Sequence, residues 1–275
     1  MAKPAPELNE VLVKVHAASV TRGDVRLRKL PFLLARLFGF RRKAMLGHEF
    51  AGQIEAVGPS VTQFKVGERV FGTTTGLTTG SYAEYICVPE DGVLATLPAN
   101  VTYEEAAPVP IGALTALHFL RKGDVATGKK VLVYGASGSV GSFAVQLATH
   151  FGARVTGVCS TSNVEMVKAL GAEKVIDYTR QDFTTAGRVY DVIFDAVGKS
   201  SPKRRKRVLA GGWILRFDPI THQGETRGSA GSQRSNGGGR AQGSHRHALL
   251  IGADDGIRTR DPHLGKDLLP CGHPS

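Results

Sequence analysis

The chain has 275 residues, of which 41% are hydrophobic and 21% are charged, and its formal net charge is +11. This length and composition are typical of a globular protein with one large or two ordinary domains. No run of about 18 apolar residues occurs, which excludes a membrane-spanning helix. The three cysteines, Cys87, Cys159 and Cys271, lie far apart and predict no disulfide framework. Because the N-terminus also lacks the apolar core of a signal peptide, we expect a cytoplasmic protein.

The positive charge is concentrated near the C-terminus. Residues 203–275 carry 13 Lys and Arg against 6 Asp and Glu, so most of the net charge of +11 lies there. An excess of basic over acidic residues usually suggests nucleic acid as a binding partner. Because the rest of the chain contributes little of this charge, we do not expect nucleic acid here. The basic run 203–207 fits a phosphate contact or a localisation signal, and the simpler interpretation is a solvated helix face.

Residues 1–110 predict a β-rich domain. Within 10–20, Val11, Val13 and Val15 share one face, which is typical of a half-buried strand. The range 25–40 is basic and apolar and predicts a short helix and a loop. Further short strands, separated by Gly, Pro and Asn turns, are predicted over 46–58, 64–72, 82–88 and 93–97.

The pattern then changes to helix and afterwards to alternating strands and helices. Thr102 and the acids after it predict a helix start, and Pro108 and Pro110 are expected to interrupt this helix. A second helix over 111–121 is predicted to bridge two domains. The following strands are predicted at 130–134, 154–159, 174–177 and 190–196, with helices at 139–150 and 163–170. This alternation predicts a doubly wound parallel sheet in an α/β domain over residues 111–217.

Three glycines follow the strand 130–134 at a spacing of three residues. Glycine lets backbone amides approach an anion closely, and the free N–H groups and dipole of the next helix then bind it. The turn therefore predicts a cradle for the pyrophosphate of a dinucleotide, although its middle glycine sits one place later than in G-x-G-x-x-G. The alternative is a plain glycine-rich turn. The predicted binding residues are Gly135, Ser137, Gly138, Ser139, Val140 and Gly141.

Residues 218–275 are predicted to be disordered. The range 221–247 is rich in Gly, Ser, Arg, Gln and His and has almost no aliphatic residue. Such a composition cannot bury enough surface to offset the entropy of the chain.

Five motifs occur in a fixed order along the chain. They are LGHEFAG at 46–52, VGERVFG at 66–72, GSYAEY at 80–85, YGASGSVG at 134–141 and FDAVG at 194–198. Together they resemble the medium-chain dehydrogenase/reductase superfamily, in particular its zinc-independent quinone oxidoreductase-like and alcohol dehydrogenase-like members. The resemblance covers residues 8–215. It implies a GroES-like β domain, then a Rossmann domain, with a substrate cleft between them and hydride transfer to a quinone, an α,β-unsaturated carbonyl, an aldehyde or a ketone.

The zinc enzymes of this superfamily raise the question of a metal. His48 and Glu49 match one element of their site, but Thr21 and Ile111 stand where the partner cysteines would be. No zinc or other metal is therefore expected. Without a metal, the charge that develops on the substrate oxygen needs a hydrogen-bond donor or a cation. The catalytic candidates are Thr21, Arg26 and His48, with Asp24 orienting them, and each also fits a structural role.

The residues at the end of the second strand of the α/β domain indicate which nicotinamide cofactor is bound. NAD enzymes commonly carry an acid at its end, which bonds the ribose 2′-OH and would repel a 2′-phosphate. Here the strand ends without an acid, and Ser160, Thr161 and Asn163 follow. These side chains can donate to a 2′-phosphate, and Tyr178 stands at a place that the family uses for that purpose. NADPH is therefore preferred, and an ordinary helix cap is the alternative.

Relatives continue past residues 208–215 with further Rossmann strands. Here the stretch Asp255–Lys266 resembles a peptide that recurs in mispredicted reading frames, so we hypothesise a frame shift near residues 200–217. The sheet would then be incomplete, and a homodimer would lack the edge that many relatives use. The leading interpretation is an NADPH-dependent, zinc-independent oxidoreductase. The alternatives are a nucleotide-binding relative without turnover, with RNA as a further ligand, and an inactive truncated product.

Overall fold

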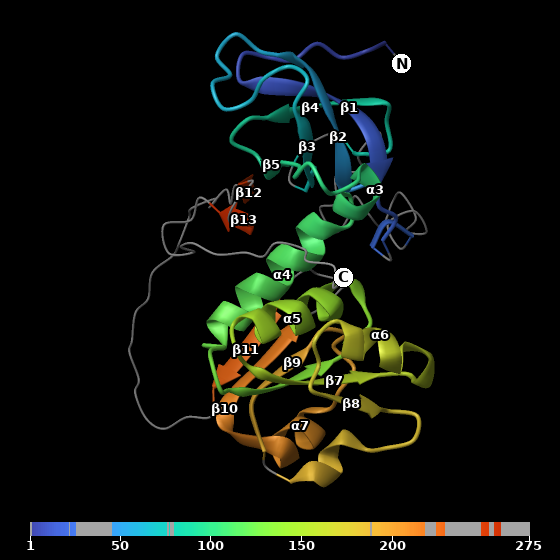
Figure 1. The fold of residues 1–275 in the computed structure, drawn as a ribbon, viewed down its shortest axis with the longest axis vertical. Coiled ribbons are helices and arrows are strands. Elements are labelled where there is room, and N and C mark those ends of the chain that lie inside the picture. Colours follow the sequence, from blue (N-terminus) through green and yellow to red (C-terminus); the bar gives the residue numbers. More distant parts are fainter. Residues whose placement is uncertain are drawn as a thin grey trace, which may run out of the picture. The chain divides into compact units, whose positions relative to one another are not determined.

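The structure is a computed structural model of the 275-residue chain. It describes residues 2–21, 23–25, 46–75, 77, 80–187, 189–217, 224–228, 249–252 and 256–259. The chain forms two compact units, one of Met1–Ile111 with Gln242–Ser275 and the other of Gly112–Ala241 (Figure 1). Each unit is described by itself below, as unit 1 and unit 2. The helix and loop predicted over 25–40 fall almost entirely outside the described residues.

Unit 1 is built on an antiparallel sheet with the strand order β4-β1-β2-β3-β5. The strands are β1 (Glu10–Ala18), β2 (Glu49–Val57), β3 (Arg69–Thr73), β4 (Tyr85–Pro89) and β5 (Leu94–Thr96). Val11 and Val13 on β1 are fully buried and pack with Phe50 and Ile54 of β2 in one core. The predicted β-rich domain is therefore present, with each predicted strand found within a few residues of its expected place.

Two helices follow the sheet. The short α3 (Tyr103–Ala106) begins with a capping box, in which the Thr102 hydroxyl accepts from Glu105 N–H and the Glu105 carboxylate accepts from Thr102 N–H. The longer α4 (Val109–Lys122) begins two residues earlier than predicted and includes Pro110. The predicted interruption is present at Pro108, which lies between α3 and α4. Pro110 was expected to interrupt the helix as well, but it lies in the first turn of α4, where its missing N–H would have no intrahelical partner in any case.

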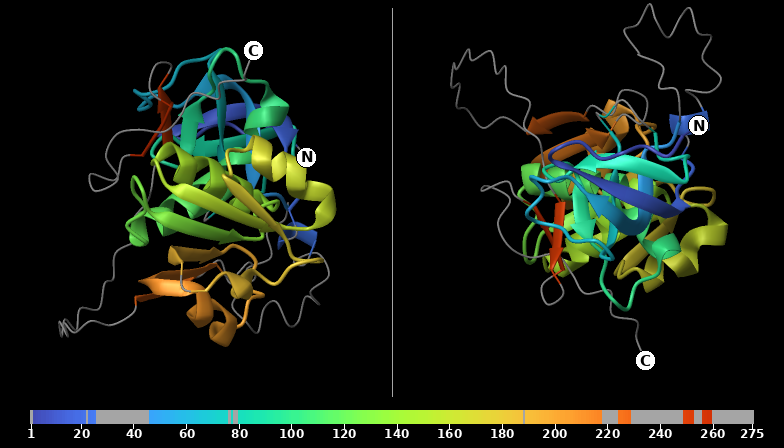
Figure 2. Two further views of the ribbon diagram at one scale, coloured as in Figure 1. Left: turned by 60° about the horizontal axis from the view of Figure 1, so that its bottom comes forward. Right: turned by 90° about the horizontal axis from the view of Figure 1, so that it is seen from above.

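Unit 2 is built on a six-stranded sheet with the order β11-β10-β9-β6-β7-β8. Its strands are β6 (Lys130–Tyr134), β7 (Arg154–Cys159), β8 (Lys174–Asp177), β9 (Tyr190–Asp195), β10 (Leu209–Phe217) and β11 (Gly224–Gly228). All neighbouring pairs from β8 to β10 are parallel, and β11 joins the edge antiparallel. Figure 2 shows this sheet from two further directions.

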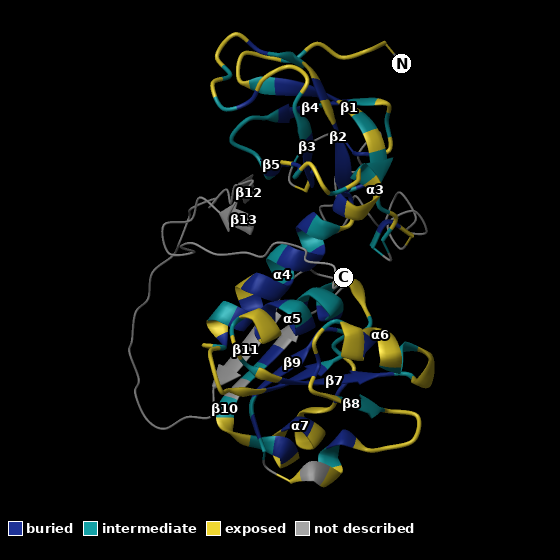
Figure 3. Ribbon diagram, in the orientation of Figure 1, coloured by how far each residue is buried: buried dark blue, intermediate teal, exposed yellow. Residues whose placement is uncertain are grey.

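The helices of unit 2 cover its central strands. Both α5 (Ser139–His150) and α6 (Val164–Ala169) contact β7, and α5 also contacts β6. The middle residues of β6, β7 and β9 are buried (Figure 3), as expected for parallel strands covered on both faces. The predicted fold class, a GroES-like β domain and a Rossmann-like parallel sheet, is confirmed.

The basic run 203–207 lies on a short helix, α7 (Pro202–Val208). It is not simply a solvated face, because Arg205 is only 6% exposed. Its Nη1 donates to a carboxylate oxygen of Asp195 at 3.0 Å and to the carbonyl oxygen of Ser200 at 2.7 Å. The sequence pattern missed this because Asp195, at the end of β9, lies ten positions before its partner.

Within the range 218–275, the structure describes three short strands. They are β11, β12 (Leu249–Gly252) and β13 (Gly256–Thr259), and the last two pair antiparallel with each other. These strands are joined by main-chain hydrogen bonds, and the disorder predicted for residues 218–275 otherwise stays a prediction. The rest of the range lies outside the described residues. In the described part of the chain, no helix has the length and apolar character needed to span a membrane.

Candidate functional site

The turn between β6 and α5 is shaped by its glycines. Gly135 has a φ of +83°, a left-handed conformation that favours glycine. Its N–H and that of Ala136 both donate to the carbonyl oxygen of Val158 on β7, at 3.0 Å. A Cβ on Gly141 would lie 2.1 Å from the carbonyl oxygen of Gly135. Only glycine therefore allows the first turn of α5 to lie this close to the end of β6.

The start of α5 presents backbone donors that no side chain caps. Gly138 is the N-cap residue, and it makes no side-chain capping hydrogen bond. Ser142 N–H makes the first hydrogen bond of the helix, to the carbonyl oxygen of Gly138 at 2.8 Å. The N–H groups of the three residues between them have no carbonyl within the helix to bond. A Cβ on Gly138 would meet one atom within 4 Å, a carbonyl oxygen at 3.5 Å, so the space beside these donors is open.

This turn lies where the strand order of the sheet reverses. β6 has β7 on one side and β9 on the other, so the chain leaves β6 in one direction and later returns on its other side. In open α/β sheets, ligands bind outside the carboxyl ends of the strands at this switch point. The predicted binding residues from Gly135 to Gly141 all lie at this switch point.

A second group of polar side chains lies where β7 and β8 end. Asp177, the last residue of β8, accepts hydrogen bonds from Thr161 Oγ1 at 2.6 Å and from the N–H and Oγ1 of Thr179 at 2.9 and 2.7 Å. The hydrogen bond from Thr161, followed by those from Thr179, lowers the pKa of Asp177 below its ordinary value. Between them, Tyr178 is 56% exposed. The Asp177 cluster is defined as Thr161, Asp177, Tyr178, Thr179 and Arg180.

The residues predicted to donate to a 2′-phosphate lie at this same edge. Asn163 Nδ2 donates to Ser160 Oγ at 2.8 Å, directly after β7. The N–H of Tyr178 donates to the carbonyl oxygen of Cys159 at 3.0 Å, which joins the end of β8 to the end of β7. Thr161, however, donates its hydroxyl hydrogen to Asp177 and so has none left for a phosphate.

Sequence reasoning missed Asp177 and Arg180. It considered an acid only at the end of β7, whereas the carboxyl end of the neighbouring parallel strand lies at the same edge. The available signal was the polar run that follows the strand 174–177, namely Tyr-Thr-Arg.

In unit 1, a hydrogen-bonded group surrounds His48. Asp24 Oδ1 lies 2.7 Å from His48 Nδ1, and Asp24 Oδ2 accepts from the N–H and Oγ1 of Thr21 at 2.8 and 2.6 Å. Burial by itself would raise the pKa of Asp24, but the hydrogen bonds from Thr21 and His48 outweigh it and lower that pKa. Because an ionised carboxylate only accepts, His48 Nδ1 carries the proton of this hydrogen bond. Asp24 thereby orients both Thr21 and the imidazole.

Glu49, the next residue along the chain, is also buried, with 3% exposure. Its Oε1 accepts from Ile111 N–H at 2.8 Å, and its Oε2 accepts from the hydroxyl of Ser19. Burial raises the pKa of Glu49, and these two hydrogen bonds offset the effect only in part. The His48 cluster is defined as Ser19, Thr21, Asp24, His48 and Glu49.

Tyr82 borders the His48 cluster. Its hydroxyl donates to the carbonyl oxygen of Ser19 at 3.0 Å. Burial and the negative charge of Asp24 raise the pKa of Tyr82 to about 12, so this phenol stays protonated at neutral pH. Of the three predicted catalytic residues, Thr21 and His48 both form a hydrogen bond with Asp24. Arg26 lies outside the described residues.

The donors near His48 fit a zinc ion poorly. His48 keeps Nε2 available, but both oxygens of Glu49 already accept hydrogen bonds. Cys87 lies on β4 opposite Leu12, at the other end of β1 from the residues that pair with the start of β2, so it is not a donor near His48. Among the residues that the structure describes, no three His, Cys, Asp or Glu side chains are grouped so as to hold a metal ion.

The raised pKa of Glu49 predicts how the unfolding free energy of the protein depends on pH. The free carboxyl titrates near 4.5, and the folded one titrates higher, so the folded state binds this proton more tightly. The unfolding free energy of the wild-type protein therefore falls as the pH rises from below 4.5 through the raised pKa. Glu49→Gln removes this dependence, and its stability relative to wild type should increase across that window. Urea unfolding over a pH series measures it.

A matched control is Glu173→Gln. Glu173 has the opposite shift, because the hydrogen bond from Arg154 lowers its pKa. Its contribution to stability is lost as the pH falls, so this variant should lose stability relative to wild type as the pH rises. A Glu49→Gln profile that runs parallel to wild type would contradict the assignment of the raised pKa.

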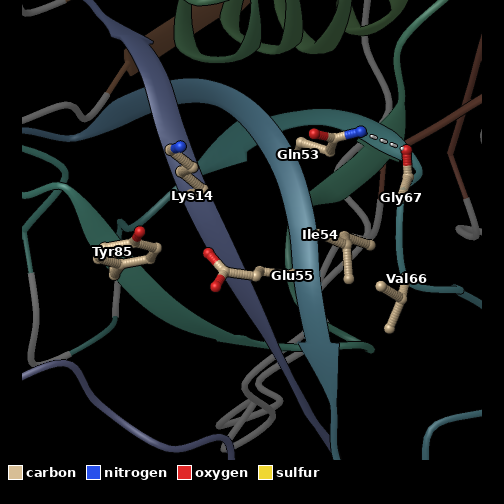
Figure 4. A pocket seen from close by; sticks show the side chains of 7 residues that line it. All are labelled: Lys14, Gln53, Ile54, Glu55, Val66, Gly67 and Tyr85. Atoms are coloured by element: carbon tan, nitrogen blue, oxygen red, sulfur yellow. Dashed lines mark hydrogen bonds between the residues drawn. The ribbon is translucent and has the colours of Figure 1, made fainter.

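Figure 4 shows a hollow lined by residues of β1, β2 and β4 and of the segment before β3. It encloses about 330 Å³ and is lined by Lys14, Gln53, Ile54, Glu55, Val66, Gly67 and Tyr85. Two of its polar side chains pair with neighbours: Gln53 Nε2 donates to the carbonyl oxygen of Gly67 at 2.9 Å, and Glu55 pairs with Lys3. The hollow contains none of the predicted site residues.

Comparisons with known proteins cover both units. Residues 7–99 match the family described as alcohol dehydrogenase GroES-like domain, and residues 139–210 match the one described as zinc-binding dehydrogenase. The chain is 34% identical over 220 residues to the chloroplastic NADPH-dependent alkenal/one oxidoreductase of Arabidopsis thaliana, which covers 76% of this chain and 56% of that protein. The chain spans about half the length of the curated relatives it matches, such as 56% of two of them.

Two solved structures are similar in fold and in sequence. The quinone oxidoreductase from Coxiella burnetii matches with 33% identity and a TM-score of 0.64, over 72% of this chain and 63% of that one. An alcohol dehydrogenase superfamily protein from Novosphingobium aromaticivorans matches with 33% identity and a TM-score of 0.70, over 81% of this chain and 69% of that one.

An antiparallel β unit, followed by a parallel α/β unit with a glycine turn at its switch point, defines the class of two-domain dehydrogenases and reductases. The chain belongs to the medium-chain dehydrogenase/reductase superfamily and is quinone oxidoreductase-like. This confirms the resemblance carried by the five sequence motifs.

Proposed function

We propose that the protein is an NADPH-dependent reductase of α,β-unsaturated carbonyl compounds or quinones. The observation that carries the proposal is the uncapped start of α5, which faces open space at the switch point of the sheet. The Arabidopsis relative is named for NADPH and alkenals or alkenones, and the Coxiella relative is named for quinones. Both names describe substrates with an electrophilic carbon conjugated to an oxygen.

The residues of unit 2 fit a dinucleotide. The backbone N–H groups at the start of α5 would hold the pyrophosphate, and the edge formed by Ser160, Asn163 and Tyr178 would hold the adenosine ribose. Asp177 is close by, but its oxygens accept three hydrogen bonds from Thr161 and Thr179. It is therefore poorly placed to accept from a ribose 2′-OH as the acid of an NAD enzyme does, which supports NADPH.

NADPH supplies a hydride to the electrophilic carbon when it is bound. The negative charge that develops on the substrate oxygen then needs a donor. Of the two described candidates in unit 1, Thr21 donates its hydroxyl hydrogen to Asp24 and has none left for the substrate oxygen. His48 is therefore the candidate donor, and Asp24 holds its ring in place. A buried carboxylate that accepts from Nδ1 fixes the orientation of a histidine ring and leaves Nε2 for the substrate oxygen. The hydrogen bond between Asp24 and His48 therefore supports His48 as the donor.

We also propose that the reaction needs no zinc. The support is the donor set around His48, where the neighbouring carboxylates of Asp24 and Glu49 are already hydrogen-bonded. Incubation with a zinc chelator should leave the rate of NADPH oxidation unchanged. A loss of activity that added zinc restores would overturn this part of the proposal.

The decisive experiment follows NADPH absorbance with a panel of alkenals, alkenones and quinones. Oxidation that depends on one of these substrates supports the reductase. NADPH fluorescence enhancement without oxidation by any of them supports the alternative, a nucleotide-binding relative without turnover. The experiment uses the full chain of 275 residues.

His48→Ala is expected to lower kcat by roughly 100-fold, which is the size of a positioned acid's contribution. The Kd for NADPH should change by less than about twofold, because the proposed nucleotide-binding residues all belong to the other unit. His16→Ala is the matched control, since His16 lies in the same unit and stacks on Tyr103 at 4.5 Å. Equal kcat values in the two variants would exclude His48 as the donor.

A further inference from the structure

Arg180 stands out among the arginines of unit 2 because its charge is exposed and loosely held. It follows β8 in the Asp177 cluster, and its side chain is 75% exposed. Its Nε lies 3.7 Å from Asp177 Oδ2, which is an ion-pair contact but too long for a hydrogen bond. Its backbone N–H donates to the carbonyl oxygen of Asp177 at 3.1 Å, so the main chain beneath the side chain is fixed.

Other arginines of this unit bind carboxylates directly. Within the described part of unit 2, the Arg180 guanidinium makes no hydrogen bond, whereas three others do so at 2.7 to 3.0 Å. These pairs are Arg154 with Glu173, Arg204 with Asp182 and Arg205 with Asp195. Arg180 thus keeps its N–H donors free for a ligand.

The carboxylate beside Arg180 does not compete strongly for those donors. Asp177 Oδ2 already accepts from Thr161, and Oδ1 accepts from Thr179. The exposed side chains of Tyr178 and Arg180 belong to the segment after β8, and the Tyr178 N–H ties this segment to the end of β7 at Cys159, the residue before Ser160. A guanidinium presents parallel N–H donors that match the oxygens of a phosphate monoester.

We propose that Arg180 binds the 2′-phosphate of NADPH and sets the preference of this protein for NADPH over NADH. The inference rests on the proposed function, because it concerns the same nucleotide site. It goes further by naming a specificity-determining residue that neither the sequence motifs nor the acid rule for β7 points to. Tyr178 lies beside this phosphate, and Asp177 positions the loop that carries both residues.

The test compares nucleotide binding by wild type and three variants of the full chain. The variants are Arg180→Ala, Arg180→Lys and, as a matched control, Arg154→Ala at the opposite end of β7. Kd values are measured by calorimetry for NADPH, NADH and the fragment 2′,5′-ADP. Arg180→Ala should raise the Kd for NADPH and for 2′,5′-ADP about 10- to 100-fold, the loss expected for charge-assisted hydrogen bonds. The Kd for NADH should change by less than about twofold.

Arg180→Lys should recover part of the affinity, because it keeps the charge but loses the fork of donors. Arg154→Ala should leave all three Kd values near wild type. An unchanged ratio of NADPH to NADH affinity in Arg180→Ala would overturn the inference while leaving the proposed function intact. A wild-type chain that binds none of the three nucleotides would overturn both.

Discussion

Gly138→Glu is expected to weaken NADPH binding by at least about 100-fold while leaving the protein folded. The new side chain fits, because Gly138 has an ordinary extended conformation with φ −82° and ψ 167° and its Cβ would meet one oxygen at 3.5 Å. It would place a carboxylate where the pyrophosphate is proposed to bind. Repulsion between like charges a few ångströms apart near a protein surface reaches about 3–4 kcal/mol, which corresponds to this loss. Calorimetric titration with NADPH measures it.

Two further variants separate charge from size at this position. Gly138→Gln has nearly the same volume without the charge and should bind NADPH at least about tenfold more tightly than Gly138→Glu. Gly138→Ala should stay within about fivefold of wild type, because the space around its Cβ is open. The negative charge lies at a helix N-terminus, so the glutamate variant should not lose more than about 1 kcal/mol of unfolding free energy. Unchanged NADPH affinity in Gly138→Glu would remove the phosphate from this turn.

Asp195→Ala is expected to cost about 3–5 kcal/mol of unfolding free energy, a large share of a typical domain's stability. Asp195 is fully buried at the end of β9 and accepts from Arg205 Nη1 at 3.0 Å. It also accepts from the N–H groups of Gly198 and Ser200, at 2.8 and 3.0 Å. Removing it leaves the buried Arg205 without a countercharge and frees the loop after β9. Urea unfolding followed by circular dichroism measures the change.

Two further variants test whether the loss of stability comes from the buried ion pair. Arg205→Met should cost less than Asp195→Ala, because Asp195 keeps its donors from the loop. Arg204→Ala should cost less than about 1 kcal/mol, since its ion pair with Asp182 is exposed on both sides. Similar losses in Arg204→Ala and Asp195→Ala would mean that the buried pair is not what holds α7 to the sheet.

The regular elements of unit 2 were predictable because their signals are local. The strands 130–134, 154–159 and 174–177 and the helix 139–150 are found at their predicted bounds. A buried parallel strand appears in the sequence as an apolar run, and glycines mark the turn after it. The start of α4 was not found at its predicted position. A proline within a helical pattern is compatible with a break in the helix or with the first turn of a helix, so its position alone does not fix where the helix begins.

The chain by itself determined the superfamily, the order of its two units and the glycine turn, since each is read from short local motifs and from the order in which they occur along the chain. Only the tertiary structure decided which polar side chains meet. Asp24 reaches His48 across 24 positions, Thr161 reaches Asp177 across 16, and Arg205 reaches Asp195 across ten. The pairing of Thr161 with Asp177 follows from strand order, because the parallel neighbours β7 and β8 bring their carboxyl ends to one edge whatever their separation along the chain. That is why Arg180 became a candidate only once β8 was placed beside β7.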